Sequence, residues 1–158
     1  MMLTDSEINQ QVRNFIHYLG FTSQDNYFTC YRYPLPILGL IPVKPITTAL
    51  ITKINLLIFT PHEVIIKKIG SGFSLVDIKR NTFDKNVIRI SKSQIKKFEI
   101  KEWVVFGINW GYLLTIEAER KFYFHVAKTN GDDFSTVNFY NVKGNNFYGL
   151  ITDDKTNL

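Results

Sequence analysis

The amino-acid sequence predicts an α+β protein that is mainly β-sheet, with one helix near the N-terminus. Apolar and polar residues alternate with a period of two through much of residues 87–126, as in strands with one buried face. The chain also holds 13 Phe and 8 Tyr, and aromatic side chains favour strands and can fill a compact core. Residues 4–20 instead repeat apolar side chains at helical spacing. A length of 158 residues suits one domain with a short appendage.

The N-terminal segment from Thr4 to Gly20 predicts an amphipathic helix. Thr4 and Glu7 have the spacing of a capping box, and Gly20 offers a left-handed stop. The apolar face between them consists of Ile8, Val12, Phe15, Ile16 and Leu19. Because an isolated helix of this length is only marginally stable in water, this face must dock on the sheet, on another subunit or on a partner.

Residues 21–45 are rich in proline and apolar residues. Pro34, Pro36, Pro42 and Pro45 oppose regular structure, yet the residues between them are more apolar than a solvated linker. We favour an extended segment packed along the core, and an exposed arm that binds a partner or touches a membrane is the alternative. The expected division is an N-terminal helix and arm over 1–45, a β domain over 46–151 and a tail over 152–158.

The remaining elements are expected from strand patterns and turn residues. Residues 47–59 and 63–69 predict a hairpin, and residues 73–78 a third strand after a glycine-containing loop. Residues 87–126 predict three or four consecutive antiparallel strands. Asp132 and Asp133 could cap a helix, but the aromatic and β-branched residues that follow them favour a short helix somewhere within 138–151.

The segment from Trp103 to Gly111 is strongly apolar and carries two tryptophans and two glycines. One interpretation is an exposed loop whose aromatic side chains anchor a partner or a membrane surface. The interpretation that we favour is a hairpin connection whose tryptophan rings cover one end of a barrel, because tryptophan is usually mostly buried.

The sequence shows no pattern of catalytic or metal-binding residues. Cys30 is the single cysteine, and His17, His62 and His125 lack the spacing of a helical metal site. The glycines near residue 71 lack the lysine and hydroxyl residue of a phosphate-binding loop. We therefore expect no enzyme activity and no cofactor or metal.

Basic residues are concentrated in the middle of the chain, which has a net charge of +5. The stretch from Lys53 to Lys101 holds eleven basic and four acidic residues. This balance could attract phosphates or anionic lipid head groups, although lysines on strands most often solvate the outer face of a sheet. The candidate anion contacts are Lys92, Lys96, Lys97 and Lys101.

The expected location is the cytoplasm, and the periphery of the membrane is the alternative. The first 20 residues lack the basic start and apolar run of a secretory signal. The longest apolar region, residues 35–59, is interrupted by Lys44, Lys53 and three prolines, which disfavours a membrane-spanning helix.

Residues 55–126 resemble the bacterial pleckstrin-homology-like domains, a set of small bacterial proteins. The resemblance is carried by the segments Leu56 to Thr60, Glu63 to Ile66, Ile90 to Ile100, Gly111 to Ile116 and Phe122 to Val126. It implies a strongly bent antiparallel sheet that forms a partly open barrel, closed at one end by a C-terminal helix. It also implies a binding or assembly module that is often oligomeric.

The leading functional hypothesis is a non-catalytic binding or oligomerisation module in a bacterial cell. Its partner would be a second copy of the chain or another protein, bound through Ile8, Val12, Phe15, Leu38 and Ile41. The alternative is binding to an anionic lipid or nucleic-acid surface through the basic region 79–101, with a steep dependence on salt.

Overall fold

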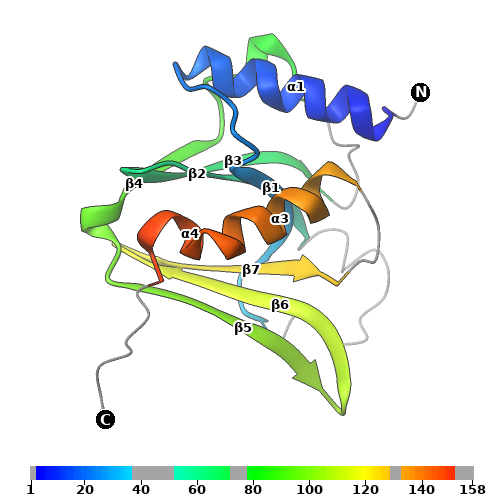
Figure 1. Ribbon diagram of the computed structural model, residues 1–158, viewed down its shortest axis with the longest axis vertical. Coiled ribbons are helices and arrows are strands. Elements are labelled where there is room, and N and C mark those ends of the chain that lie inside the picture. The colour runs from blue at the N-terminus through cyan, green and yellow to red at the C-terminus, as the bar shows by residue number, and fades with distance from the viewer. Residues whose placement is uncertain (1–2, 37–51, 72–77, 129–132, 152–158) are drawn as a thin grey trace.

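A computed structural model describes residues 3–36, 52–71, 78–128 and 133–151 (Figure 1). One antiparallel sheet of seven strands has the order β4-β3-β2-β1-β7-β6-β5. The strands are β1 (Tyr27–Tyr33), β2 (Lys53–Phe59), β3 (Glu63–Ser71), β4 (Val87–Ser91), β5 (Lys97–Val105), β6 (Ile108–Glu117) and β7 (Lys121–Ala127). The prediction of a mainly β, α+β protein is confirmed at this level.

The sheet consists of two meanders, β1 to β4 and β5 to β7, which are joined where β1 pairs with β7. The strand pattern of residues 87–126 therefore spans two parts of the sheet. β4 pairs with β3 and makes no ladder with β5, although only residues 92–96, which include the short η3 turn (Lys92–Gln94), lie between them. The last three strands of that stretch form consecutive antiparallel pairs, as the alternation predicts.

Helix α3 (Phe134–Gly144) lies between the two meanders and fills the interior of the bent sheet (Figure 1). Its Phe139 and Val142 join the main core, which also contains Phe28, Phe59 and Phe124. The helix begins earlier than residues 138–151, because the Asp133 carboxylate accepts a hydrogen bond from the Thr136 N–H at 2.9 Å. The N-cap outweighed the strand propensity of the residues that follow it.

Helix α1 (Asp5–Tyr18) packs on the opposite face of the four-stranded half of the sheet (Figure 1). Thr4 and Glu7 form the capping box. Val12, Phe15 and Ile16 are fully buried in a second core, which they share with Tyr27, Leu56, Ile58, Ile65, Ile69, Ile78 and Phe83. The sheet between the two cores is thus buried on both faces over β1, β2 and β3.

Lys67 ties the second core to the connection between β3 and β4. This side chain is only 2% exposed, and its ammonium donates to the carbonyls of Thr82 and Lys85 at 2.8 and 2.7 Å. The ammonium also lies 5.1 Å from the centre of the Phe15 ring. Burial lowers the pKa of Lys67. Lys67 thus connects the segment that contains Thr82 and Lys85 to Phe15 of α1.

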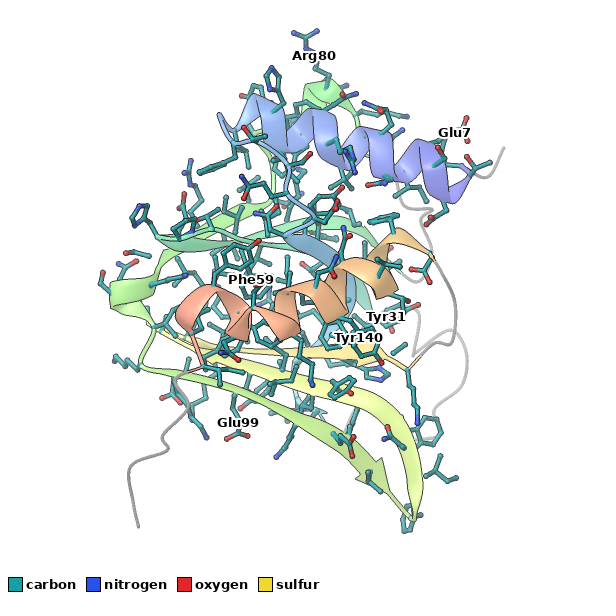
Figure 2. All side chains as sticks on the ribbon, in the orientation of Figure 1. Glu7, Tyr31, Phe59, Arg80, Glu99 and Tyr140 are labelled. Atoms are coloured by element: carbon teal, nitrogen blue, oxygen red, sulfur yellow. The ribbon has the colours of Figure 1, made fainter. Side chains whose placement is uncertain are left out.

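The chain after α3 makes a left-handed turn, labelled α4 (Asn146–Gly149). Its four residues all have positive φ, between 49° and 88°. Phe147 is nevertheless fully buried against Phe59, Phe98 and Phe139, and Figure 2 shows Phe59 in this interior. The Lys92 ammonium donates to the Tyr148 carbonyl, which fixes the turn to η3.

β1 corrects the expected division of the chain at residue 45. It lies in the stretch assigned to the N-terminal helix and arm, yet it is the central strand of the sheet. Residues 27–33 therefore belong to the β domain. Among the described helices, none combines the length and apolar character needed to cross a membrane.

Candidate functional site

The hairpin formed by β5 and β6 extends beyond the neighbouring strands (Figure 1). The residues at its end are mostly apolar. Phe106 at its turn is 99% exposed. Val104, Ile108 and Trp110 are exposed by 53%, 56% and 46%. We call residues 104–110 the hairpin tip. Large apolar side chains at this exposure on one projecting element point to a contact surface.

The exposed apolar side chains lie on both faces of the hairpin tip. Val104 pairs with Asn109, and Val105 pairs with Ile108. Directly opposed residues share a face, and successive residues alternate between faces, so Val104 and Ile108 are on opposite faces. Phe106 lies at the turn between them. The tip therefore presents apolar surface on two sides and at its end.

Phe106 and Gly107 form a two-residue turn in which both residues have positive φ, 52° and 74°. Turns of this kind match the twist of a hairpin but favour asparagine, aspartate or glycine. A phenylalanine in the left-handed region is strained by about 1–2 kcal/mol. Because its side chain is almost completely exposed, burial within the fold does not offset that strain.

Gly111 fixes the direction in which the hairpin leaves the sheet. Its φ is 116°, and an added Cβ would lie 2.2 Å from the Val126 carbonyl oxygen. The ladder shifts register between Glu102 and Val104, where two residues of β6, Trp110 and Gly111, oppose Trp103. This bulge requires a glycine, since any side chain would collide with the β7 backbone.

His125 on β7 fastens the base of the hairpin. Its Nε2 donates to the Trp110 carbonyl at 2.6 Å, and the Trp103 ring packs edge-on against the imidazole with centroids 4.9 Å apart. Burial lowers the pKa of His125, and the hydrogen bond to Trp110 opposes this in part. Trp103 is 8% exposed, so the two tryptophans have different environments. Of the two tryptophan rings expected to be buried, only that of Trp103 is buried.

The four lysines predicted to bind anions do not converge on one site. Lys92 donates to the Tyr148 carbonyl. Lys97 and Lys101 lie on the outer face of β5 on either side of Glu99, at 2.9 and 3.7 Å from its carboxylate, and Figure 2 shows Glu99 pointing away from the fold. Lys96 is exposed just before β5. Two of the four lysines thus share one carboxylate, and a third binds a backbone carbonyl.

The helix residues predicted to contact a partner pack instead against other residues of the same chain. Val12 and Phe15 have 0% exposure in the second core. Ile8 is partly buried at the margin of this core. The free energy that docks α1 comes from this internal burial, and the prediction is corrected for Val12 and Phe15. Leu38 and Ile41 lie outside the described residues.

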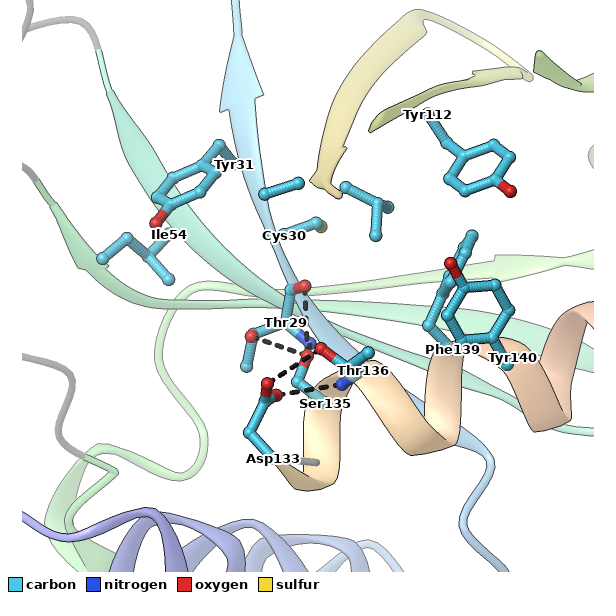
Figure 3. A pocket seen from close by; sticks show the side chains of 12 residues that line it. Thr29, Cys30, Tyr31, Ile54, Tyr112, Asp133, Ser135, Thr136, Phe139 and Tyr140 are labelled. Atoms are coloured by element: carbon cyan, nitrogen blue, oxygen red, sulfur yellow. Dashed lines mark hydrogen bonds between the residues drawn. The ribbon is translucent and has the colours of Figure 1, made fainter. Parts of the chain in front are cut away.

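A cavity of about 210 Å³ lies beside the N-terminus of α3 (Figure 3). In Figure 3, Thr29, Ser135 and Thr136 face one side, and the Tyr112 and Tyr140 rings lie on another. The Ser135 hydroxyl binds the Thr29 N–H and hydroxyl at 2.8 and 2.9 Å, so these polar groups connect α3 to β1. They hold the helix in place.

The described residues contain no cluster of three or more potential metal-binding side chains. Burial raises the pKa of the Cys30 thiol, which is 3% exposed on the inner face of β1. A protonated, enclosed thiol is a poor nucleophile. Among the described residues, the most exposed large apolar side chain, that of Phe106, lies on the hairpin tip.

Sequence reasoning identified the tip segment but not its most exposed residue. The period-two pattern stops at Val104, and the run of apolar residues that follows is typical of both a buried connection and an exposed anchor. Phe106-Gly107 does not match the usual asparagine-glycine hairpin turn. The signal available in the sequence was the position of Phe106, which lies among apolar residues between two strands that each have a polar face.

Comparison with known proteins adds one distant structural neighbour. No family model matches the chain, and no curated protein matches it. Among solved structures, the chain is similar to the hSac2 domain of the human phosphoinositide phosphatase Sac2, with a TM-score of 0.45 and 10% sequence identity. The match covers 91% of this chain and 81% of that one. At this level the likeness carries no argument about fold or function.

Proposed function

We propose that this protein is a non-catalytic binding module with a pleckstrin-homology-like fold, and that its hairpin tip makes the contact. Two features support the fold: the strand order β4-β3-β2-β1-β7-β6-β5, and the position of α3 inside the bent sheet. Both agree with the partly open barrel and C-terminal helix that the sequence resemblance implies.

The observation that carries the function is the almost complete exposure of Phe106. Burying a side chain of this size stabilises a complex by about 1.5–3 kcal/mol, and Val104, Ile108 and Trp110 add partly exposed apolar area beside it. The fold gains nothing from an exposed phenylalanine in a strained turn. A residue that opposes the local rules of folding without compensation is typical of a functional surface.

Binding of anions through the basic region has less support from the same structure. Glu99 lies between Lys97 and Lys101, and Lys92 is committed to a backbone carbonyl. Ion pairs of this kind on the surface are weak, so the lysines could still exchange partners. The contact through the tip requires no such exchange.

In a purified sample, the partner available to the hairpin tip is a second copy of the chain. Self-association therefore tests the contact made by the tip. We define the tip variant as Phe106→Asn with Ile108→Thr. We define the matched control variant as Tyr18→Asn with Val137→Thr, which removes similar side chains that are 57% and 47% exposed on α1 and α3. Light scattering over a range of protein concentrations should show the wild-type mass rising above 18.4 kDa.

The tip variant should remain near 18.4 kDa at all concentrations, and the control variant should behave as the wild type. A mass that rises equally in the tip variant would place the contact elsewhere. Circular dichroism of each variant verifies that the fold is retained, since both substituted pairs are exposed.

A further inference from the structure

The arrangement of apolar surface on the hairpin tip restricts what can cover it. Val104 and Ile108 are on opposite faces, and Phe106 lies at the end. A flat protein surface could cover one face and would leave the other in water. A second hairpin packed face to face would do the same. A medium that surrounds the tip on all sides would bury both faces and the end at once.

Polarity changes in a regular order from the turn toward the sheet. The apolar residues 104–106 and 108 come first, with Asn109 paired to Val104. Trp110, 46% exposed, comes next, while Trp103 is buried against His125. Charged residues follow, with Lys101 and Glu102 on β5. This is the order of a lipid interface, in which hydrocarbon is followed by a belt of aromatic side chains at the head groups and then by water.

The dimensions of the tip also match the shallow part of a bilayer. Trp110 is three residues from the turn, which corresponds to roughly 10 Å along a strand. Interfacial segments insert their apolar side chains about 5–10 Å into the boundary of head groups and acyl chains. The rigid base at Gly111 and His125 holds the hairpin away from the sheet, so the tip can enter without the fold following it.

From these observations we propose that the hairpin tip inserts into the interfacial layer of a lipid bilayer. This rests on the proposed function, because it names the partner of the same contact. Phe106 enters the acyl-chain boundary, Val104 and Ile108 contact lipid on either side, and Trp110 lies among the head groups. The driving force is apolar burial. Residues 97–102 hold two basic and two acidic side chains, so anionic lipid is not required.

Vesicle flotation with the full chain tests the proposal. Two vesicle compositions are compared, phosphatidylcholine alone and phosphatidylcholine mixed with phosphatidylglycerol, each at low and at moderate salt. The wild type should bind both compositions with little effect of salt. The tip variant should bind at least about tenfold more weakly, since loss of the Phe106 side chain alone accounts for that factor and loss of Ile108 adds to it. The control variant should bind as the wild type.

A second measurement locates the inserted residue. The chain has two tryptophans, of which Trp103 is 8% and Trp110 46% exposed. Lipids brominated near the head-group end of their acyl chains should quench the exposed tryptophan, and vesicle binding should shift its emission to shorter wavelength. The tip variant keeps both tryptophans but should show neither effect.

The remaining outcomes separate the two proposals. Absence of vesicle binding, with self-association that the tip variant abolishes, would overturn the lipid proposal and retain the contact at the tip. Binding that needs phosphatidylglycerol, falls steeply with salt and is unchanged in the tip variant would overturn it in favour of the basic surface. If the tip variant matches the wild type in both experiments, both proposals fail.

Discussion

Phe106 combines two properties that a folded protein rarely gives one residue, a left-handed backbone and a fully exposed apolar side chain. Asparagine occupies the left-handed region with less strain and exposes a polar amide. At position 106, asparagine would therefore stabilise the turn, whereas phenylalanine suits a contact. This difference separates folding from binding experimentally.

The single substitution Phe106→Asn should leave the fold intact and raise its free energy of unfolding by up to about 1 kcal/mol, because the turn is relieved of strain. Urea denaturation followed by circular dichroism measures this value. The same protein should lose self-association and vesicle binding. Lower stability in the variant would mean that the Phe106 side chain packs within the fold.

His125 gives the base of the hairpin a dependence on pH. Burial lowers its pKa in the folded state below the ordinary value of 6.5. The unfolded chain therefore binds a proton first as the pH falls, and the folded state loses stability below about pH 6.5. The contribution is fully present above that pH.

Thermal unfolding at several values between about pH 5 and pH 8 should show this loss in the wild type. His125→Gln removes the titrating group, so its unfolding temperature should depend less on pH across the same range. His17→Gln, which alters an exposed histidine on α1, is the control and should retain the wild-type dependence. Equal profiles for all three proteins would show that His125 does not govern the change.

At the scale of elements, local signals in the sequence predicted what local interactions determine. The Thr4 and Glu7 pair forms the capping box of α1, and alternation placed β5, β6 and β7. The start of α3 was missed because the strand-forming residues after Asp133 mask its cap, and the packing of Phe139 against the sheet adds to the cap in favouring the helix. Helix propensity alone contains no information about those contacts.

The left-handed turn α4 shows the same limit. Asn146, Phe147 and Tyr148 adopt a conformation that few non-glycine residues favour. Burial of Phe147 and the hydrogen bond from Lys92 compensate for it. Both partners are distant in sequence, so no local pattern could have indicated the turn.

Lys92→Met should destabilise the protein by about 1–2 kcal/mol, because the Tyr148 carbonyl loses its donor while the aliphatic part of the side chain is kept. Chemical denaturation measures the difference. Lys96→Met is the matched control, an exposed lysine four residues away, and should change stability by no more than about 0.5 kcal/mol. A Lys92 variant as stable as the control would show that Phe147 alone holds the turn.

At the scale of the whole molecule, the sequence predicted a sheet but not its connectivity. Alternation indicates which face of a strand is buried and gives no partner, so β4 was grouped with the strands that follow it. The apolar face of α1 posed the same problem, since helical spacing shows that a surface must be covered but not by what. The structure covers it with β1, β2 and β3 and, within the described residues, leaves the hairpin tip as an exposed apolar surface.

The place of β1 in the sheet has a consequence for how the chain folds during synthesis. Tyr31 pairs with His125, and Arg32 pairs with Phe124. The strand pairing that joins the two meanders therefore connects a segment that is synthesised early with one that is synthesised late. β1 can pair with β2 soon after both leave the ribosome, but its other edge stays open until β7 has been made. Pairings this far apart in sequence form slowly. In that interval the unpaired edge of β1 exposes backbone donors and acceptors, and it is the place where a nascent chain would first recruit a chaperone or pair with a neighbouring copy.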